Sequence, residues 1–79
     1  MINKGGPAVM KDLKYFNNEY EKVLHSNLSD KQKTLKYSKL MTEMEQVYNI
    51  PILKNERWES ENKAIIAMYR KLSMSRKFP

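Results

Sequence analysis

The residues of this chain that could perform chemistry stand in groups too small for a metal site. The single histidine, His25, follows Glu21 by four residues, which places both side chains on one face of a helix. One imidazole and one carboxylate fall short of the three or four protein ligands that a zinc ion takes. We therefore expect His25 to interact with the carbonyl end of its helix and with Glu21.

Three glutamates form a second group, at residues 56, 59 and 61. Paired carboxylates act as acid and base when their surroundings separate their pKa values. At the start of a helix, however, exposed glutamates are stabilised by the helix dipole without any catalytic role. The chain has no cysteine and no glycine-rich phosphate loop. We therefore predict that the protein is not an enzyme and has no catalytic, cofactor-binding or metal-binding residues.

Three segments with apolar residues at helical spacing must position any functional side chain. They cover residues 8–26, 29–49 and 55–75. The apolar stripe of the first segment is Val9, Leu13, Phe16, Tyr20 and Val23, widened by Met10 and Leu24; that of the second is Tyr37, Leu40, Met41, Met44, Val47 and Tyr48; that of the third is Trp58, Ile65, Met68, Tyr69 and Leu72. Ser29 and Gln32 match a capping box at the start of the second segment, and Pro51 ends that segment. No segment alternates as a β-strand does. The sequence predicts an all-α fold, a compact three-helix bundle. The alternative is a looser arrangement of the three helices that is completed by dimerisation.

The third segment and the connector before it predict one corner of the core. The connector of residues 50–54 is unusually apolar, and we expect Ile50, Ile52 and Leu53 to be at least partly buried at one end of the bundle. Trp58 is in register with Ile65, two helical turns later. We therefore predict that Trp58 is a core residue and packs near Ile52 or Leu53.

The organisation outside the helices is simple. We expect residues 1–7 to form a flexible tail, residues 8–79 one helical domain, and the residues after Ser75 a short basic tail. No apolar run approaches the ~20 residues of a membrane span, and the N-terminus has no apolar core of a signal peptide. Lysines outnumber arginines twelve to three, a bias typical of AT-rich genes. These features predict a cytoplasmic bacterial protein.

The net charge of +6 increases toward the C-terminus. The last 25 residues carry six lysines and arginines against three glutamates. On the predicted third helix Lys63, Arg70 and Lys77 recur every seven residues and form one ridge on the solvent side. A second basic run, residues 31–39, opens the second helix. This distribution favours an anionic partner.

Together these patterns predict a small binding or regulatory protein that acts through protein–protein interaction. The predicted contact surface is the third helix with its tail, and its candidate residues are Lys63, Arg70, Lys71, Met74, Arg76, Lys77 and Phe78. The cations would steer an acidic protein partner, and Met74 or Phe78 would supply apolar contact. The alternative is a nucleic-acid-binding protein that uses the basic faces of the second and third helices. Self-association as a homodimer is a further alternative.

Overall fold

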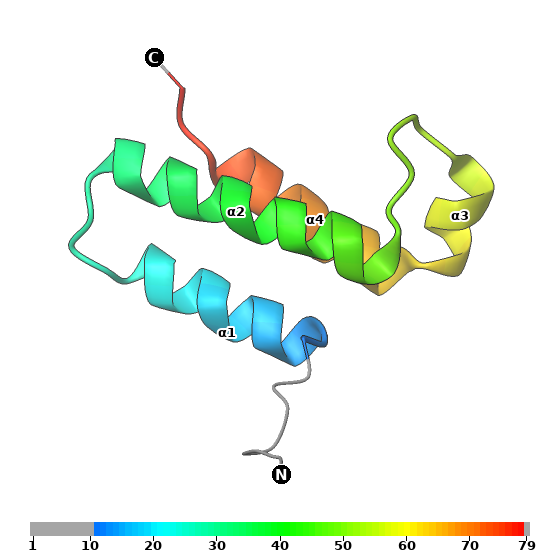
Figure 1. The fold of residues 1–79 in the computed structure, drawn as a ribbon, viewed down its shortest axis with the longest axis horizontal. Helices are drawn as coiled ribbons and strands as arrows, with labels where there is room; N and C mark the ends of the chain where they lie inside the picture. The colour runs from blue at the N-terminus through cyan, green and yellow to red at the C-terminus, as the bar shows by residue number, and fades with distance from the viewer. Residues whose placement is uncertain (1–10, 79) are drawn as a thin grey trace, which may run out of the picture.

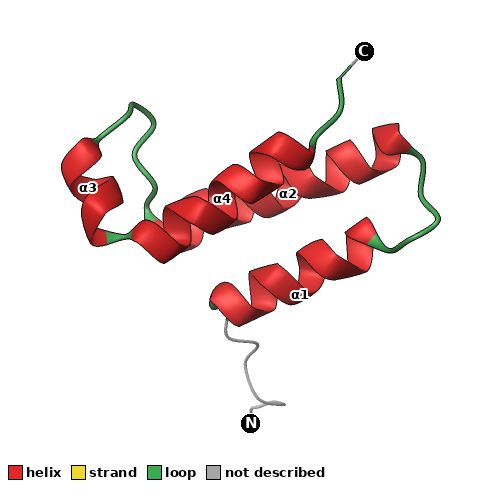
Figure 2. Ribbon diagram, turned by 180° about the vertical axis from the view of Figure 1, so that it is seen from behind, coloured by secondary structure: helices red, strands yellow, loops and turns green. Residues whose placement is uncertain are grey.

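The computed structural model describes residues 11–78, which form four helices and no strand. The helices are α1 (Leu13–Leu24), α2 (Asp30–Tyr48), α3 (Glu56–Glu61) and α4 (Lys63–Ser75). The long helices α1, α2 and α4 pack into a bundle in which α2 runs antiparallel to the other two (Figure 1). Among the helices, α3 contacts α4 alone and lies beyond one end of the bundle (Figure 2).

The all-α prediction is therefore confirmed, whereas the count of three helices is wrong by one. The predicted helix of residues 55–75 is divided into α3 and α4 at Asn62, whose backbone leaves the helical region (φ −132°, ψ 44°). The Asn62 side-chain amide donates to the Trp58 carbonyl at 2.8 Å. Asparagine side chains compete in this way with the continuing helix for backbone hydrogen bonds. The predicted tail of residues 1–7 and residues 8–10 of the predicted first helix lie outside the described residues. Lys11 and Asp12 are not helical, so α1 begins at Leu13, later than predicted.

Local signals set the ends of the two N-terminal helices. Asp12 caps α1, because its carboxylate accepts the N–H of Tyr15 at 2.9 Å. The predicted capping box of α2 is confirmed: Ser29 Oγ accepts the Gln32 N–H at 3.2 Å, and Gln32 Oε1 accepts the Ser29 N–H at 3.3 Å. Asn49 ends α2 in the left-handed region (φ 53°), a conformation that asparagine tolerates better than most residues.

The core is built from the inward faces of the three long helices. Phe16, Met44 and Leu72 are the largest fully buried side chains, and each comes from a different helix. The remaining buried apolar residues are Tyr20, Val23, Tyr37, Leu40, Met41 and Met68. All nine belong to the apolar stripes that the sequence predicts. The stripes therefore position α1, α2 and α4 relative to one another.

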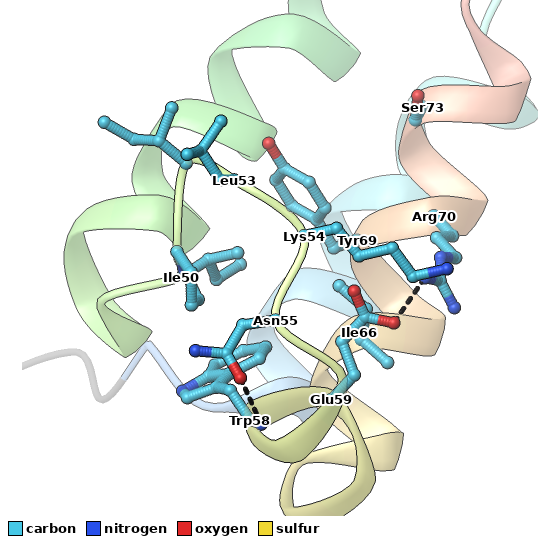
Figure 3. Close-up of a pocket in the computed structure, with 12 residues that line it drawn as sticks. Ile50, Leu53, Lys54, Asn55, Trp58, Glu59, Ile66, Tyr69, Arg70 and Ser73 are labelled. Atoms are coloured by element: carbon cyan, nitrogen blue, oxygen red, sulfur yellow. Dashed lines mark hydrogen bonds and ion pairs between the residues drawn. The ribbon is translucent and has the colours of Figure 1, made fainter.

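The prediction that Trp58 is a core residue is wrong, and so is the prediction that Ile52 and Leu53 are partly buried. The same prediction is confirmed for Ile50, which is partly buried and packs against the core. Trp58 is half-buried, and α3 has no buried residue. Ile52 and Leu53 are 101% and 81% exposed. Because the helix breaks at Asn62, Trp58 does not continue the apolar face of α4. It lines an open pocket of about 200 Å³ together with the connector and the α4 residue Tyr69 (Figure 3).

Candidate protein-binding surface

The antiparallel packing of α2 and α4 brings lysines from the start of α2 and the last two cations of the chain, Arg76 and Lys77, to one end of the bundle. The start of α2 lies beside the end of α4 and the C-terminal tail (Figure 1). We call this region the basic end and define it as Leu24, residues 30–36 and residues 74–78. It carries five lysines and arginines and a single acid, Asp30. One end of the bundle therefore has a strongly positive surface.

The tail is held on α2 by hydrogen bonds to its backbone. Thr34 is the one buried polar side chain among residues 11–78. Its Oγ1 accepts the N–H of Lys77 at 2.8 Å and donates to the Lys77 carbonyl at 3.1 Å. Arg76 Nη1 donates to Ser38 Oγ at 3.3 Å, and the Arg76 guanidinium lies 5.1 Å from the centre of the Phe78 ring. These contacts give residues 76–78 a defined position beside α2.

Exposed apolar side chains gather at the same end. Of the seven large apolar residues that are exposed between residues 11 and 78, four belong to the basic end. They are Leu24 at 39%, Leu35 at 63%, Met74 at 83% and Phe78 at 67% exposure. Contiguous exposed apolar groups with a polar rim are typical of interaction sites. Apolar side chains scattered singly would not carry that inference.

The four apolar residues line two open hollows, two residues in each. Leu35 and Phe78 line one hollow of about 570 Å³, and Leu24 and Met74 line the other, of about 250 Å³. Asp30 and Lys77 line both. Their side chains form an ion pair across 3.8 Å, and each is about 70% exposed (72% for Lys77 and 68% for Asp30). A charged pair is therefore shared by the two hollows, of which the larger is mostly apolar and the smaller has a mixed polar and apolar lining.

The lysines of this end have different roles. Lys33 Nζ donates to the Leu24 carbonyl at 3.0 Å and so satisfies the end of α1. Lys31 and Lys36 are exposed and have no ion-pair partner among residues 11–78. A cation in the first turn of a helix, as at Lys31, is disfavoured by the helix dipole. Helix stability therefore does not explain Lys31, whereas an anionic partner would.

The structure brings together four of the seven predicted contact residues and separates the other three. Met74, Arg76, Lys77 and Phe78 lie at the basic end. Lys71 instead reaches across to α1, where Nζ lies 4.9 Å from the centre of the Tyr20 ring.

Lys63 begins α4 at the opposite end, and Arg70 bonds to Glu59 of α3 at 2.5 Å. The predicted ridge of Lys63, Arg70 and Lys77 does not form, because α4 ends at Ser75.

Sequence reasoning missed the apolar part of this surface on α1 and α2. Leu35 stands outside the apolar stripe of α2, among lysines at positions 31, 36 and 39. A large apolar residue on the charged face of a helix is the signal that could have identified it. In the sequence Leu24 only widens the apolar stripe of α1. No local signal predicts that it lines a surface hollow together with Met74.

The other groups of ionisable residues are paired at the surface. His25 Nε2 lies 3.3 Å from Glu21 Oε1, as predicted, and His25 is the C-terminal cap residue of α1. Glu59 is paired with Arg70, and Glu61 lies 3.8 Å from Arg57. Within residues 11–78 no three histidine or acidic side chains are grouped so that they could hold a metal ion. No helix of this part of the chain is long and apolar enough to cross a membrane.

Comparisons with protein families, with curated proteins and with solved structures found no match to this chain. Function is therefore inferred from the chemistry of the basic end.

Proposed function

We propose that this chain is a small, non-enzymatic binding protein of the bacterial cytoplasm that regulates a protein partner through direct contact. The contact surface is the basic end. One observation carries the proposal: four exposed apolar side chains, from α1, α2, α4 and the tail, gather there beside five cations, and hydrogen bonds hold the tail in place. An apolar centre with a charged rim is the usual composition of a protein interface.

The exposed apolar side chains of the basic end favour a protein partner over a nucleic acid. Phosphate contacts need lysines and arginines but no apolar neighbours, whereas single-stranded bases need aromatic rings on which to stack. Phe78 is the one aromatic side chain that lines the larger hollow. Leu35 and Met74 have no role in contacts with phosphate, but both suit the dry centre of a protein interface.

A pair of matched variants tests the proposal. Leu35→Ser and Val47→Ser each remove one exposed apolar side chain from α2, at the basic end and near the opposite end respectively. The wild-type protein and each variant are immobilised and exposed to a nuclease-treated bacterial lysate. We expect the wild type and Val47→Ser to retain the same partner and Leu35→Ser to lose it. Equal retention by both variants, with helical content unchanged, would exclude the basic end as the contact surface.

Nucleic-acid binding is the second candidate, and the unpaired lysines support it. Lys31 and Lys36 are exposed at the basic end, and Lys39 extends the same run along α2. Their contribution is tested by measuring affinity for duplex DNA and single-stranded RNA as salt is raised through about 0.15 M. A linear fall of log affinity with log salt that persists in Leu35→Ser would favour this function over protein binding.

A further inference from the structure

We infer that the basic end binds an acidic, amphipathic protein segment whose carboxylate replaces Asp30 as the partner of Lys77, while flanking apolar side chains enter the two hollows. This inference rests on the proposed function, and it specifies the chemistry of the partner. It also assigns Asp30 a role as an internal competitor for the binding site.

The arrangement of the two hollows determines the pattern of the segment. Leu35 and Phe78 form an apolar wall on one side of the Asp30–Lys77 pair, and Leu24 and Met74 form one on the other. A segment that fills both hollows must cross the charged pair between them. It therefore presents apolar side chains on either side of a group that suits Lys77, and a carboxylate is the group that matches an ammonium ion.

Asp30 is a weak partner for Lys77. The two charged atoms are 3.8 Å apart and both side chains are largely exposed, so water screens their attraction. The Lys77 backbone is anchored independently, because both of its polar groups bond to Thr34. Lys77 therefore keeps its position when its side chain changes partner. A carboxylate delivered between two apolar contacts would be better shielded from water than Asp30 is, and its attraction to Lys77 would be stronger.

The surrounding charge selects an acidic segment. Asp30 is the single acid of the basic end, against Lys31, Lys33, Lys36, Arg76 and Lys77. The other exposed apolar pair, Ile52 and Leu53, adjoins a pocket with both signs of charge, including the bonded pair of Glu59 and Arg70. That end offers no preference for an acidic partner over a basic one. The basic end does, because like charges repel a basic segment.

Selection from a random peptide library tests the inference directly, since it requires only the protein itself. Random 12-residue peptides, a length of roughly three helical turns, are displayed and selected on the wild-type protein. Peptides that also bind Leu35→Ser are removed. We expect the enriched peptides to place aspartate or glutamate between or beside large apolar residues. Enrichment of peptides without acidic residues, or no enrichment that depends on Leu35, would overturn the inference.

Affinities of one enriched peptide, measured by fluorescence anisotropy, then test the role of Asp30. Phe78→Ser should weaken binding roughly tenfold, while the control Val47→Ser leaves it unchanged. Asp30→Asn removes the competing charge and should tighten binding several-fold, an effect that disappears when Lys77→Gln is combined with it. Asp30→Asn binding that is weaker than wild type, or tightening that survives the loss of Lys77, would show that Asp30 does not compete.

Failure of this inference can be told apart from failure of the proposed function. A lysate partner that depends on Leu35, together with library peptides that lack acids, would leave protein binding intact and overturn only the acidic segment. A lysate partner that is indifferent to Leu35 would overturn both. Leu35-independent binding of duplex DNA with a linear salt dependence would assign the basic end to nucleic acid instead.

Discussion

Thr34→Val is the substitution that most directly tests how the contact surface is built. Valine has nearly the same shape as threonine but lacks the hydroxyl, so it removes both bonds to the Lys77 backbone, of 2.8 Å and 3.1 Å. The core around residue 34 should otherwise remain filled. We expect the helices to stay folded and the tail of residues 76–78 to leave its position on α2.

The magnitude follows from the two lost hydrogen bonds. Each typically contributes about 0.5–1.5 kcal/mol to the free energy of unfolding. Lys77 is exposed, so water can satisfy its released N–H and carbonyl, and no unsatisfied buried group remains. The added methyl group is buried and offsets up to about 0.8 kcal/mol. We expect a net loss of about 1 kcal/mol, which lowers the melting temperature of a domain of this size by roughly 4–8 °C.

Two measurements separate this prediction from a general loss of stability. Thermal unfolding followed by circular dichroism gives the size of the effect, and amide hydrogen exchange reports on the Lys77 N–H. The Lys77 amide should be protected in the wild type and in Thr34→Ser, which keeps the hydroxyl, and should exchange rapidly in Thr34→Val. Unchanged protection of the Lys77 amide in Thr34→Val would refute the claim that Thr34 holds the tail.

Three further predictions concern the fold. Ser29→Ala should lower the free energy of unfolding by about 0.5–2 kcal/mol, measured by urea denaturation, because it removes the capping box of α2; an unchanged midpoint would contradict this role. Leu72→Ala should cost roughly 2–5 kcal/mol because Leu72 is fully buried, and Trp58→Ala should cost less because Trp58 is half-buried; the reverse order in the same assay would be inconsistent with this structure. Burial, followed by the hydrogen bond to Glu45, raises the pKa of Tyr69 to about 12 from the ordinary 10.0. The resulting stabilisation should be complete below pH 10 and lost as the pH rises toward 12, and a phenolate absorbance titration with an ordinary midpoint would argue against this environment.

Local patterns in the sequence were sufficient for much of the fold. The apolar spacing in α1 and α2 and the capping box at Ser29 depend on residues within a few positions of one another, and helix formation responds to such short-range signals. The nine core residues all belong to predicted stripes, because a helix that buries one face leaves its periodicity in the sequence. Those features are local, and the tertiary structure is not required to recognise them.

The helix break at Asn62 could not be predicted from these local patterns. The residues from Asn55 to Ser75 carry good helical spacing, and Trp58 falls in register with Ile65. Whether the helix continues depends on a balance between one more turn of backbone hydrogen bonds and the Asn62 side chain bonded to the Trp58 carbonyl. That balance is a small difference between large terms, and the apolar spacing of the sequence does not reveal it.

At the basic end, the composition of the surface was determined by the sequence and its arrangement by the tertiary structure. The sequence alone determined that the chain is basic, that cations concentrate in residues 31–39 and 70–77, and that Met74 and Phe78 accompany the second of these runs. Only the tertiary structure decided which of these residues meet, because Thr34 and Lys77 are 43 positions apart and touch only when α2 and α4 pack antiparallel. The packing of the core fixes that pairing, and the surface residues follow the helices that carry them. Charge and apolar content are properties of the chain, whereas their placement around Lys77 is a property of the fold.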